Sequence, residues 1–218
     1  KKALISFRNG LQSLPAALQN SPGVSVKFNH RVDGIKQAGD KWMLEFENRE
    51  ASFHEKIIST LPANVLPELM REKSTLFHEL NDITYAPMSV IHLGYKKGHI
   101  HHQLDGFGML VPEAEDFDIL GTLFSSTLFP ERAPEAHALL TTFVGGARNP
   151  ELAHKSTDSL IATVQQNLDR LLGISGTPVF SKHTYWERAI PQYEVGYDRQ
   201  IKIMRDIENE FPGLFLAG

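Results

Sequence analysis

The stretch from Trp186 to Tyr197 constrains the fold more than any other part of the sequence, because it places a proline and a glycine among large side chains. Pro191 fixes its own φ angle and has no N–H to donate, so it is excluded from the middle of a central strand. Gly196 lets the backbone turn where a side chain would clash. We therefore expect a strand that ends near Pro191 and leads from one structural unit into another. On these residues alone, an aromatic anchor for a loop is the plainer interpretation of Trp186.

Composition and charge exclude several classes of function. The 218 residues are 41% hydrophobic and 22% charged, which is ordinary for a globular chain of one large or two small domains. The formal net charge of -4 provides no basic surface for nucleic acid. No apolar run reaches the roughly 18 residues of a membrane span. The absence of cysteine excludes disulfides, thiol nucleophiles and thiolate metal sites, and it is compatible with the cytoplasm.

The periodicity of apolar residues predicts an α+β (mixed α/β) fold. Apolar residues at helical spacing predict helices over residues 11–18, 63–70, 76–80, 156–172 and 198–210. Alternating or continuous apolar runs predict strands over residues 24–28, 30–35, 41–47, 55–60, 87–95, 106–112, 118–125, 138–145 and 179–186. Alternation along residues 87–95 places four residues on one side of that strand: Met88, Val90, His92 and Gly94. We expect unit boundaries near Tyr85 and near Pro191.

Four ordered motifs resemble segments of the protoporphyrinogen oxidases, which are flavin enzymes of haem synthesis within the wider amine-oxidase-like group. The motifs are Gly106-Phe107-Gly108-Met109-Leu110-Val111-Pro112, Leu128-Phe129-Pro130-Glu131, Phe143-Val144-Gly145-Gly146 and Ile190-Pro191-Gln192-Tyr193 after Trp186. They extend over most of the chain, so their joint occurrence is a stronger indication than any one of them.

The N-terminal part resembles the wider amine-oxidase-like group. Residues 7–18 are similar to its Phe-x-Gly-Gly-Met-x-x-Leu motif and keep the second glycine as Gly10, but Asn9 and Leu11 depart from the pattern. A helix, a β-meander and a strand entering Thr-x-Pro-Ala are how such chains return to their dinucleotide-binding fold. The resemblance implies a partial FAD-binding domain over residues 1–84, a substrate-binding domain with a mixed sheet and flanking helices over 85–191, and the start of the C-terminal FAD-domain segment over 192–218.

The resemblance also implies the site residues. It assigns an apolar slot for a tetrapyrrole to Phe107, Gly108, Leu110 and Phe143. The glycines at 106 and 108 would let a planar ring approach the backbone, and the large apolar side chains would form the walls. Taken one at a time, each of these residues is better explained as ordinary sheet core. The resemblance assigns contacts with FAD to Val32, Trp186, Ala217 and Gly218.

Other kinds of chemistry find little support. His99-Ile100-His101-His102 is the candidate metal motif, but adjacent histidines on a strand point to opposite faces and carboxylates are few nearby, so we expect a solvated turn and no metal site. The sequence contains no Gly-x-Ser-x-Gly, and no residue stands out as a general acid or base, so none is named as catalytic. It also contains no Gly-x-Gly-x-x-Gly. We expect an internal fragment that lacks the N-terminal FAD fingerprint and the C-terminal FAD motif, and that is inactive alone.

The reaction implied by the resemblance is oxidation of protoporphyrinogen IX, or of coproporphyrinogen III, to the porphyrin, with FAD as cofactor and O2 as acceptor. One alternative is another flavin oxidase, such as an amine oxidase or a polyene desaturase, in which Trp186 and Tyr193 would form an aromatic cage. A second alternative is a flavin-free tetrapyrrole-binding module. We expect a cytoplasmic protein that binds no nucleic acid. The resemblance leaves open whether the full-length protein associates peripherally with the cytoplasmic membrane or forms a homodimer.

Overall fold

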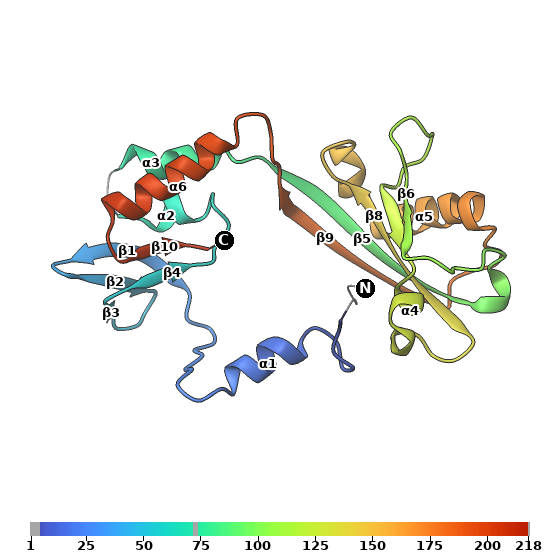
Figure 1. The fold of residues 1–218 in the computed structure, drawn as a ribbon, viewed down its shortest axis with the longest axis horizontal. Coiled ribbons are helices and arrows are strands. Elements are labelled where there is room, and N and C mark those ends of the chain that lie inside the picture. The colour runs from blue at the N-terminus through green and yellow to red at the C-terminus, as the bar shows by residue number, and fades with distance from the viewer. Residues whose placement is uncertain (1–4, 72–73, 218) are drawn as a thin grey trace. The chain divides into compact units, whose positions relative to one another are not determined.

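The computed structural model describes residues 5–71 and 74–217 (Figure 1). Contacts divide the described chain into two units: residues 5–24 with Tyr85–Ile190 form the first, and Ser25–Thr84 with residues 191–217 form the second. The contacts therefore place residues 5–24 with the first unit, whereas the sequence analysis assigned them to the same domain as residues 25–84. The functional assignment of these ranges stays a prediction.

The first unit is built on a five-stranded sheet with the order β6-β7-β8-β5-β9. Its strands are β5 (Tyr85–Lys96), β6 (Gly108–Leu110), β7 (Gly121–Leu123), β8 (His137–Gly145) and β9 (Phe180–Pro191). Pro191 is the last residue of β9, which is an edge strand, as expected for a residue without an N–H. Backbone hydrogen bonds from Val179 to Gly94 and from Gln192 to Thr84 show that β9 runs antiparallel to β5.

The helix α5 (Thr157–Leu172) supplies the core of this unit, and its apolar stripe confirms the sequence prediction. The stripe consists of residues that are at most 2% exposed: Leu160, Val164, Leu168 and Leu172. Each such burial contributes about 1.5–3 kcal/mol. The Ser156 side chain accepts a hydrogen bond from the Ser159 N–H, and Gly173 ends the helix at a φ of 59°. None of the helices in the described part of the chain combines the length and the apolarity needed to cross a bilayer.

Shorter helices complete the first unit. They are α1 (Ser13–Gln19), η2 (Lys97–His99), α4 (Ser125–Leu128), η3 (Pro130–Arg132) and η4 (Pro150–His154). The helix α1 occupies the range that the sequence indicated, with Pro15 inside its first turn, where a missing N–H costs little. Its predicted apolar stripe has no buried member, because Leu11, Leu14 and Leu18 are all about half exposed or more.

The second unit combines a meander with a parallel strand pair. The strands β1 (Val32–Ala38), β2 (Lys41–Phe46) and β3 (Ser52–His54) form an antiparallel sheet, and β4 (Ile57–Ser59) pairs in parallel with β10 (Leu214–Leu216). The helices are α2 (Leu66–Leu69), α3 (Thr75–Glu79), η1 (Leu80–Asp82) and α6 (Asp198–Glu210). Its core contains Trp42, which is 1% exposed and donates its indole N–H to the Pro212 carbonyl at 3.1 Å.

Several predictions of local structure were wrong or incomplete, and the strands expected over 106–112 and 118–125 shrink to the three-residue strands β6 and β7. Residues 24–28 form no strand, and Val24, Val26 and Phe28 are 46–64% exposed. An alternating pattern needs both a neighbouring strand and a core, and the described structure provides neither at this segment. The helix expected over 63–70 shrinks to α2, which ends where Met70 turns to an extended conformation. The short strand β3 was not predicted. The overall class is nevertheless confirmed, since the fold is α+β with mixed sheets and helices.

Candidate functional site

One face of the sheet in the first unit is covered, and the other is largely open. On the covered face, the Ser89 hydroxyl donates to the Ala153 carbonyl of η4 at 2.7 Å, and His183 is hydrogen-bonded to Thr157 at the start of α5. On the opposite face, the described residues place the short helix α4 at one edge, where the Ser125 and Thr141 hydroxyls are 2.7 Å apart, and the end of η3 with the following loop beside β8. We call this opposite side the open face.

Strand register defines which residues share the open face, because residues directly opposite each other project to the same side. One row runs across four strands through Leu110, Gly121, Phe143 and Val90. The next row runs through Gly108, Leu123, Thr141 and His92. The alternate residues of β5 and β8 point to the covered face and are fully buried, among them Ile91, Leu93, Leu140 and Val144.

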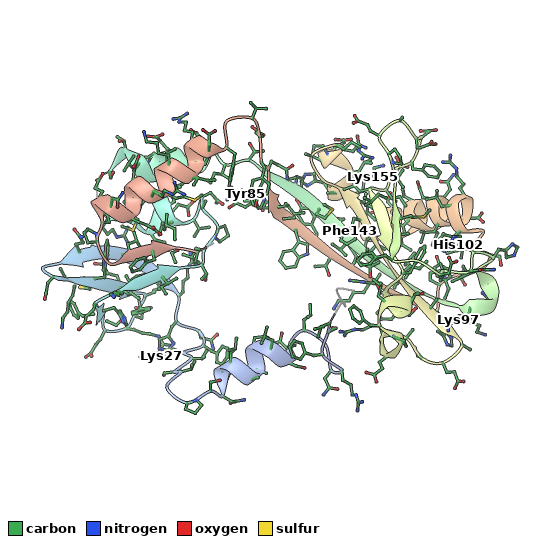
Figure 2. The ribbon with its side chains drawn as sticks, viewed as in Figure 1. Lys27, Tyr85, Lys97, His102, Phe143 and Lys155 are labelled. Carbon is green, nitrogen blue, oxygen red and sulfur yellow. The ribbon has the colours of Figure 1, made fainter. Side chains whose placement is uncertain are left out.

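Three of the four predicted pocket residues therefore lie on the open face. Leu110 and Phe143 occupy the same row, and Gly108 lies in the next one (Figure 2 labels Phe143). Leu110 is 89% exposed and Phe143 is half-buried. Phe107 lies outside β6, is 52% exposed, and accepts a backbone hydrogen bond from Phe124. The register brings these residues together, and their role in binding a substrate stays a prediction.

The two glycines of this segment differ in what surrounds them. A Cβ on Gly108 would lie 2.3 Å from the Thr122 carbonyl oxygen and 2.9 Å from the Leu123 Cα, so close approach of β7 requires glycine at this position. A Cβ on Gly106 would meet no atom closer than 4.0 Å. The sequence interpretation, in which both glycines make room for a planar ring, thus misses the backbone constraint at Gly108.

The edge strand β9 adds further residues to the open face. His183 is fixed on the covered face by its hydrogen bond to Ser89 at 2.9 Å. Because strand residues alternate, Phe180, Lys182 and Trp186 project to the open face. The distance between Gly94 and Phe180 supports this: Gly94 shares the face of His92, and a Cβ on Gly94 would lie 3.1 Å from the Phe180 Cβ. Trp186, which is 55% exposed, therefore belongs to the same sheet face as Phe143, and its predicted contact with FAD stays a prediction.

A pocket of about 370 Å³ opens on the same side of the sheet, within the usual range for small-molecule sites. Gly94 and Leu139, which line it, are opposed residues of β5 and β8 in the row beyond His92 and Thr141. Its complete lining is Gly94, Arg132, Ala133, Pro134, His137, Ala138, Leu139, Val179 and Phe180. We call it the Arg132 pocket. Sequence reasoning missed it, although its loop directly follows the Leu128-Phe129-Pro130-Glu131 motif.

His92 is the polar group near the middle of the open face. One ring nitrogen, Nδ1, lies 2.9 Å from the Thr141 hydroxyl. Burial lowers the pKa of His92 below its ordinary value of 6.5, and the charge of Lys182 lowers it further. His92 is therefore neutral at pH 7. It can exchange hydrogen bonds with a ligand, but it adds no charge to the open face.

The residues predicted to contact FAD in the second unit lie on its strands or beside them. Val32 begins β1 and packs against the core, and the Ala217 N–H donates to the Ser59 carbonyl at 2.9 Å just after β10. Gly218 lies outside the described residues. Asp33 Oδ2 and Asn64 Oδ1 are buried without a hydrogen-bond partner in the described structure. Such acceptors can take hydrogen bonds from hydroxyl or amino donors, and a role of these residues in FAD binding stays a prediction.

The structure does not test the aromatic cage of the amine-oxidase alternative, because its two residues belong to different units. The Tyr193 ring packs edge-on against Tyr197, with 4.7 Å between the ring centroids, and Trp186 belongs to the other unit. In the candidate metal motif, the His101 backbone N–H donates to the Gly173 carbonyl, His102 Nδ1 accepts from the Leu104 backbone N–H, and His99 Nδ1 is buried without a hydrogen-bond partner in the described structure.

Comparison with known proteins gives the family. The sequence model of the flavin containing amine oxidoreductase family matches residues 2–218. Protoporphyrinogen oxidase 2, chloroplastic/mitochondrial, from Arabidopsis thaliana is 37% identical over 234 residues, which cover 98% of this chain and 45% of that protein. Coproporphyrinogen III oxidase from Bacillus subtilis is 25% identical over 215 residues, which cover 98% of this chain and 46% of that protein. The chain thus spans less than half the length of these relatives.

A solved structure shows the same fold. A candidate protoporphyrinogen oxidase from Exiguobacterium sp. 255-15 superposes with a TM-score of 0.82 at 22% sequence identity, over 98% of this chain and 47% of that one. The fold likeness and the family match both extend over nearly the whole chain. The chain therefore belongs to the flavin containing amine oxidoreductase family.

Proposed function

We propose that the full-length protein oxidises a porphyrinogen, either protoporphyrinogen IX or coproporphyrinogen III, to the corresponding porphyrin in haem biosynthesis, with FAD as cofactor and O2 as final acceptor. The observation that carries this proposal is the open face, a broad apolar sheet surface on which Leu110, Phe143 and Trp186 are all accessible. The apolar macrocycle of a tetrapyrrole matches such a surface, and relatives from a plant and a bacterium are named as oxidases of the two candidate substrates.

The roles of individual residues follow from their positions. Leu110 and Phe143 would contact the macrocycle, and burying them against it would remove their exposed apolar area from water. Val32, Ala217 and Gly218 would contact FAD in the second unit, with Trp186 beside the ring system. FAD, when bound, supplies the electron acceptor for dehydrogenation, while the protein supplies binding and orientation. No described residue is assigned as a catalytic acid or base.

The same proposal extends to the domains and the setting of the protein. Residues 1–84 and 192–218 would belong to the FAD-binding domain, and residues 85–191 would form the substrate-binding domain. The protein would act in the cytoplasm. Peripheral attachment to the cytoplasmic membrane and homodimerisation are further proposals, which flotation with liposomes and sedimentation equilibrium of the full-length protein would test.

The test of the proposed function is anaerobic reduction of the bound flavin. The full-length protein is purified with its cofactor, mixed with protoporphyrinogen IX or coproporphyrinogen III without oxygen, and followed by the loss of oxidised-flavin absorbance. We expect bleaching by a porphyrinogen and no bleaching by a primary amine such as putrescine. Bleaching by the amine alone would favour the amine-oxidase alternative. Purification without any flavin would contradict the proposal and favour a flavin-free binding module.

A further inference from the structure

Among the described residues, Arg132 and Lys182 are cations at the open face without an acidic partner, and Lys96 of β5 and Arg188 of β9 project to the same face. Arg132 lines the Arg132 pocket. Its guanidinium donates from Nη2 to the Ser6 hydroxyl at 2.8 Å and to the Phe7 carbonyl at 3.4 Å, and it lies 5.9 Å from the centroid of the Phe129 ring, so its contacts are neutral groups. Lys182 forms no ion pair within residues 5–71 and 74–217. Both cations therefore keep their charge available for a ligand.

The strand geometry places Lys182 next to the Arg132 pocket. Phe180 lines the pocket, and Lys182 follows two residues later on the same face, about 7 Å along the strand. Because Phe180 lies beside Gly94 and β9 runs antiparallel to β5, Lys182 follows beside His92, in the row of His92 and Thr141. Lys182 thus lies between the pocket and the apolar row that contains Phe143.

No carboxylate on the strands neutralises these cations. The strand positions that project to the open face carry no aspartate or glutamate in the described part of the chain. Glu187 of β9 differs from Lys182 by an odd number of positions, so it projects to the covered face. Glu131, the acidic neighbour of Arg132 in η3, pairs with Arg8 at 3.5 Å. The strand positions of the open face therefore combine apolar residues with cations, Lys182 toward the Arg132 pocket and Arg188 toward the other end of β9, which complements an apolar ring that carries carboxylates.

We propose that Arg132 and Lys182 bind the carboxylates of the propionate side chains of the porphyrinogen, while the macrocycle lies on the row of Leu110 and Phe143. This inference rests on the proposed function and adds an orientation to it. The rows of Leu139 and Phe143 are about 13 Å apart along β8, because four residues rise about 3.3 Å each. A large ring can therefore contact Phe143 while its side chains reach the pocket. Arginine suits this role because its planar fork matches a carboxylate.

The test compares a porphyrin acid with its ester. The full-length protein is titrated with protoporphyrin IX and, separately, with protoporphyrin IX dimethyl ester, which keeps the ring and removes both charges. Binding is followed by the fluorescence anisotropy of the porphyrin. The variants are Lys182→Met and Arg132→Met, and Arg132→Lys separates loss of charge from loss of the bonds to Ser6 and Phe7. The matched control is Lys155→Met, because Lys155 is an exposed lysine that follows η4 near the covered face (Figure 2).

We expect Lys182→Met to raise the Kd of the acid about fivefold, the order expected for one exposed charge contact, and to leave the Kd of the ester unchanged. Arg132→Met should act in the same direction, Arg132→Lys should retain part of the affinity, and Lys155→Met should match the wild type. Unchanged affinity for the acid in both methionine variants, or equal losses of affinity for the acid and the ester, would overturn this inference and leave the proposed function standing. Failure of the wild type to bind either porphyrin would contradict the proposed function and the inference with it.

Discussion

Substituting Gly108 tests whether its missing side chain serves the sheet or the ligand. An alanine Cβ would lie 2.3 Å from the Thr122 carbonyl oxygen, and the residue would keep a φ of 153°. Relief of such a clash typically costs about 1–3 kcal/mol, and the unfavourable backbone angle adds about 1–3 kcal/mol. We therefore expect Gly108→Ala to lower the free energy of unfolding by about 2–6 kcal/mol. For a chain of this size that corresponds to a fall in Tm of at least about 4 °C.

Gly106→Ala is the matched control, because a Cβ at that position meets no atom closer than 4.0 Å. We expect its free energy of unfolding to stay within about 0.5 kcal/mol of the wild type. Both variants are measured by urea denaturation followed by circular dichroism, and by thermal melting. Equal stability of the two variants would refute the steric argument. If Gly108→Ala kept its stability but lost porphyrin binding, the glycine would serve close approach of a ring instead.

Three further predictions follow from burial, from protonation and from helix capping. Leu110→Ala should weaken porphyrin binding in a fluorescence titration with little change in urea stability, whereas Leu140→Ala, at a fully buried position, should cost about 2–5 kcal/mol; the reverse pattern would contradict the assignment of the two faces. Burial lowers the pKa of both His92 and His183, and the Lys182 charge also lowers that of His92, so as the pH falls the unfolded chain takes up protons before the folded one. The free energy of unfolding should therefore fall as the pH drops through 6.5. Replacing both histidines with glutamine should reduce this pH dependence of Tm in melts between pH 5.5 and 8, and an unchanged dependence would refute the argument. Gly173→Ala should destabilise the protein by about 1 kcal/mol or more in the same denaturation assay, because φ there is 59°, and a stabilised variant would contradict the cap assignment.

Much of the fold could be predicted because apolar periodicity and helix-end residues in short segments determined it. The helix α5 combined an apolar stripe with a serine at its start and a glycine at its end, and α6 had the bounds that its amphipathic pattern indicated. The strand predicted over residues 24–28 was wrong for a physical reason, because an alternating pattern indicates only which side chains could share a face. Whether a neighbouring strand exists to pair with it depends on tertiary structure, which the pattern of a short segment does not contain.

The candidate site could be predicted only in part. Motif resemblance indicated Leu110 and Phe143, and the strand register places them in one row. The Arg132 pocket could not be predicted, because it forms where a loop, β5 and the start of β9 meet, and no local periodicity relates these segments. The constraint on Gly108 was also hidden, since a Gly-x-Gly pattern does not reveal whether the space beside each glycine belongs to a ligand or to a strand.

The most direct test of the proposed porphyrinogen chemistry is the rate of porphyrin formation by the full-length protein. Protoporphyrinogen IX and coproporphyrinogen III are supplied separately in air, and porphyrin fluorescence is followed against an enzyme-free control. We predict accelerated appearance of the porphyrin from at least one substrate, and the faster one identifies the preferred porphyrinogen. A rate equal to the enzyme-free control for both substrates, with FAD bound to the protein, would contradict the assignment of the open face to a porphyrinogen.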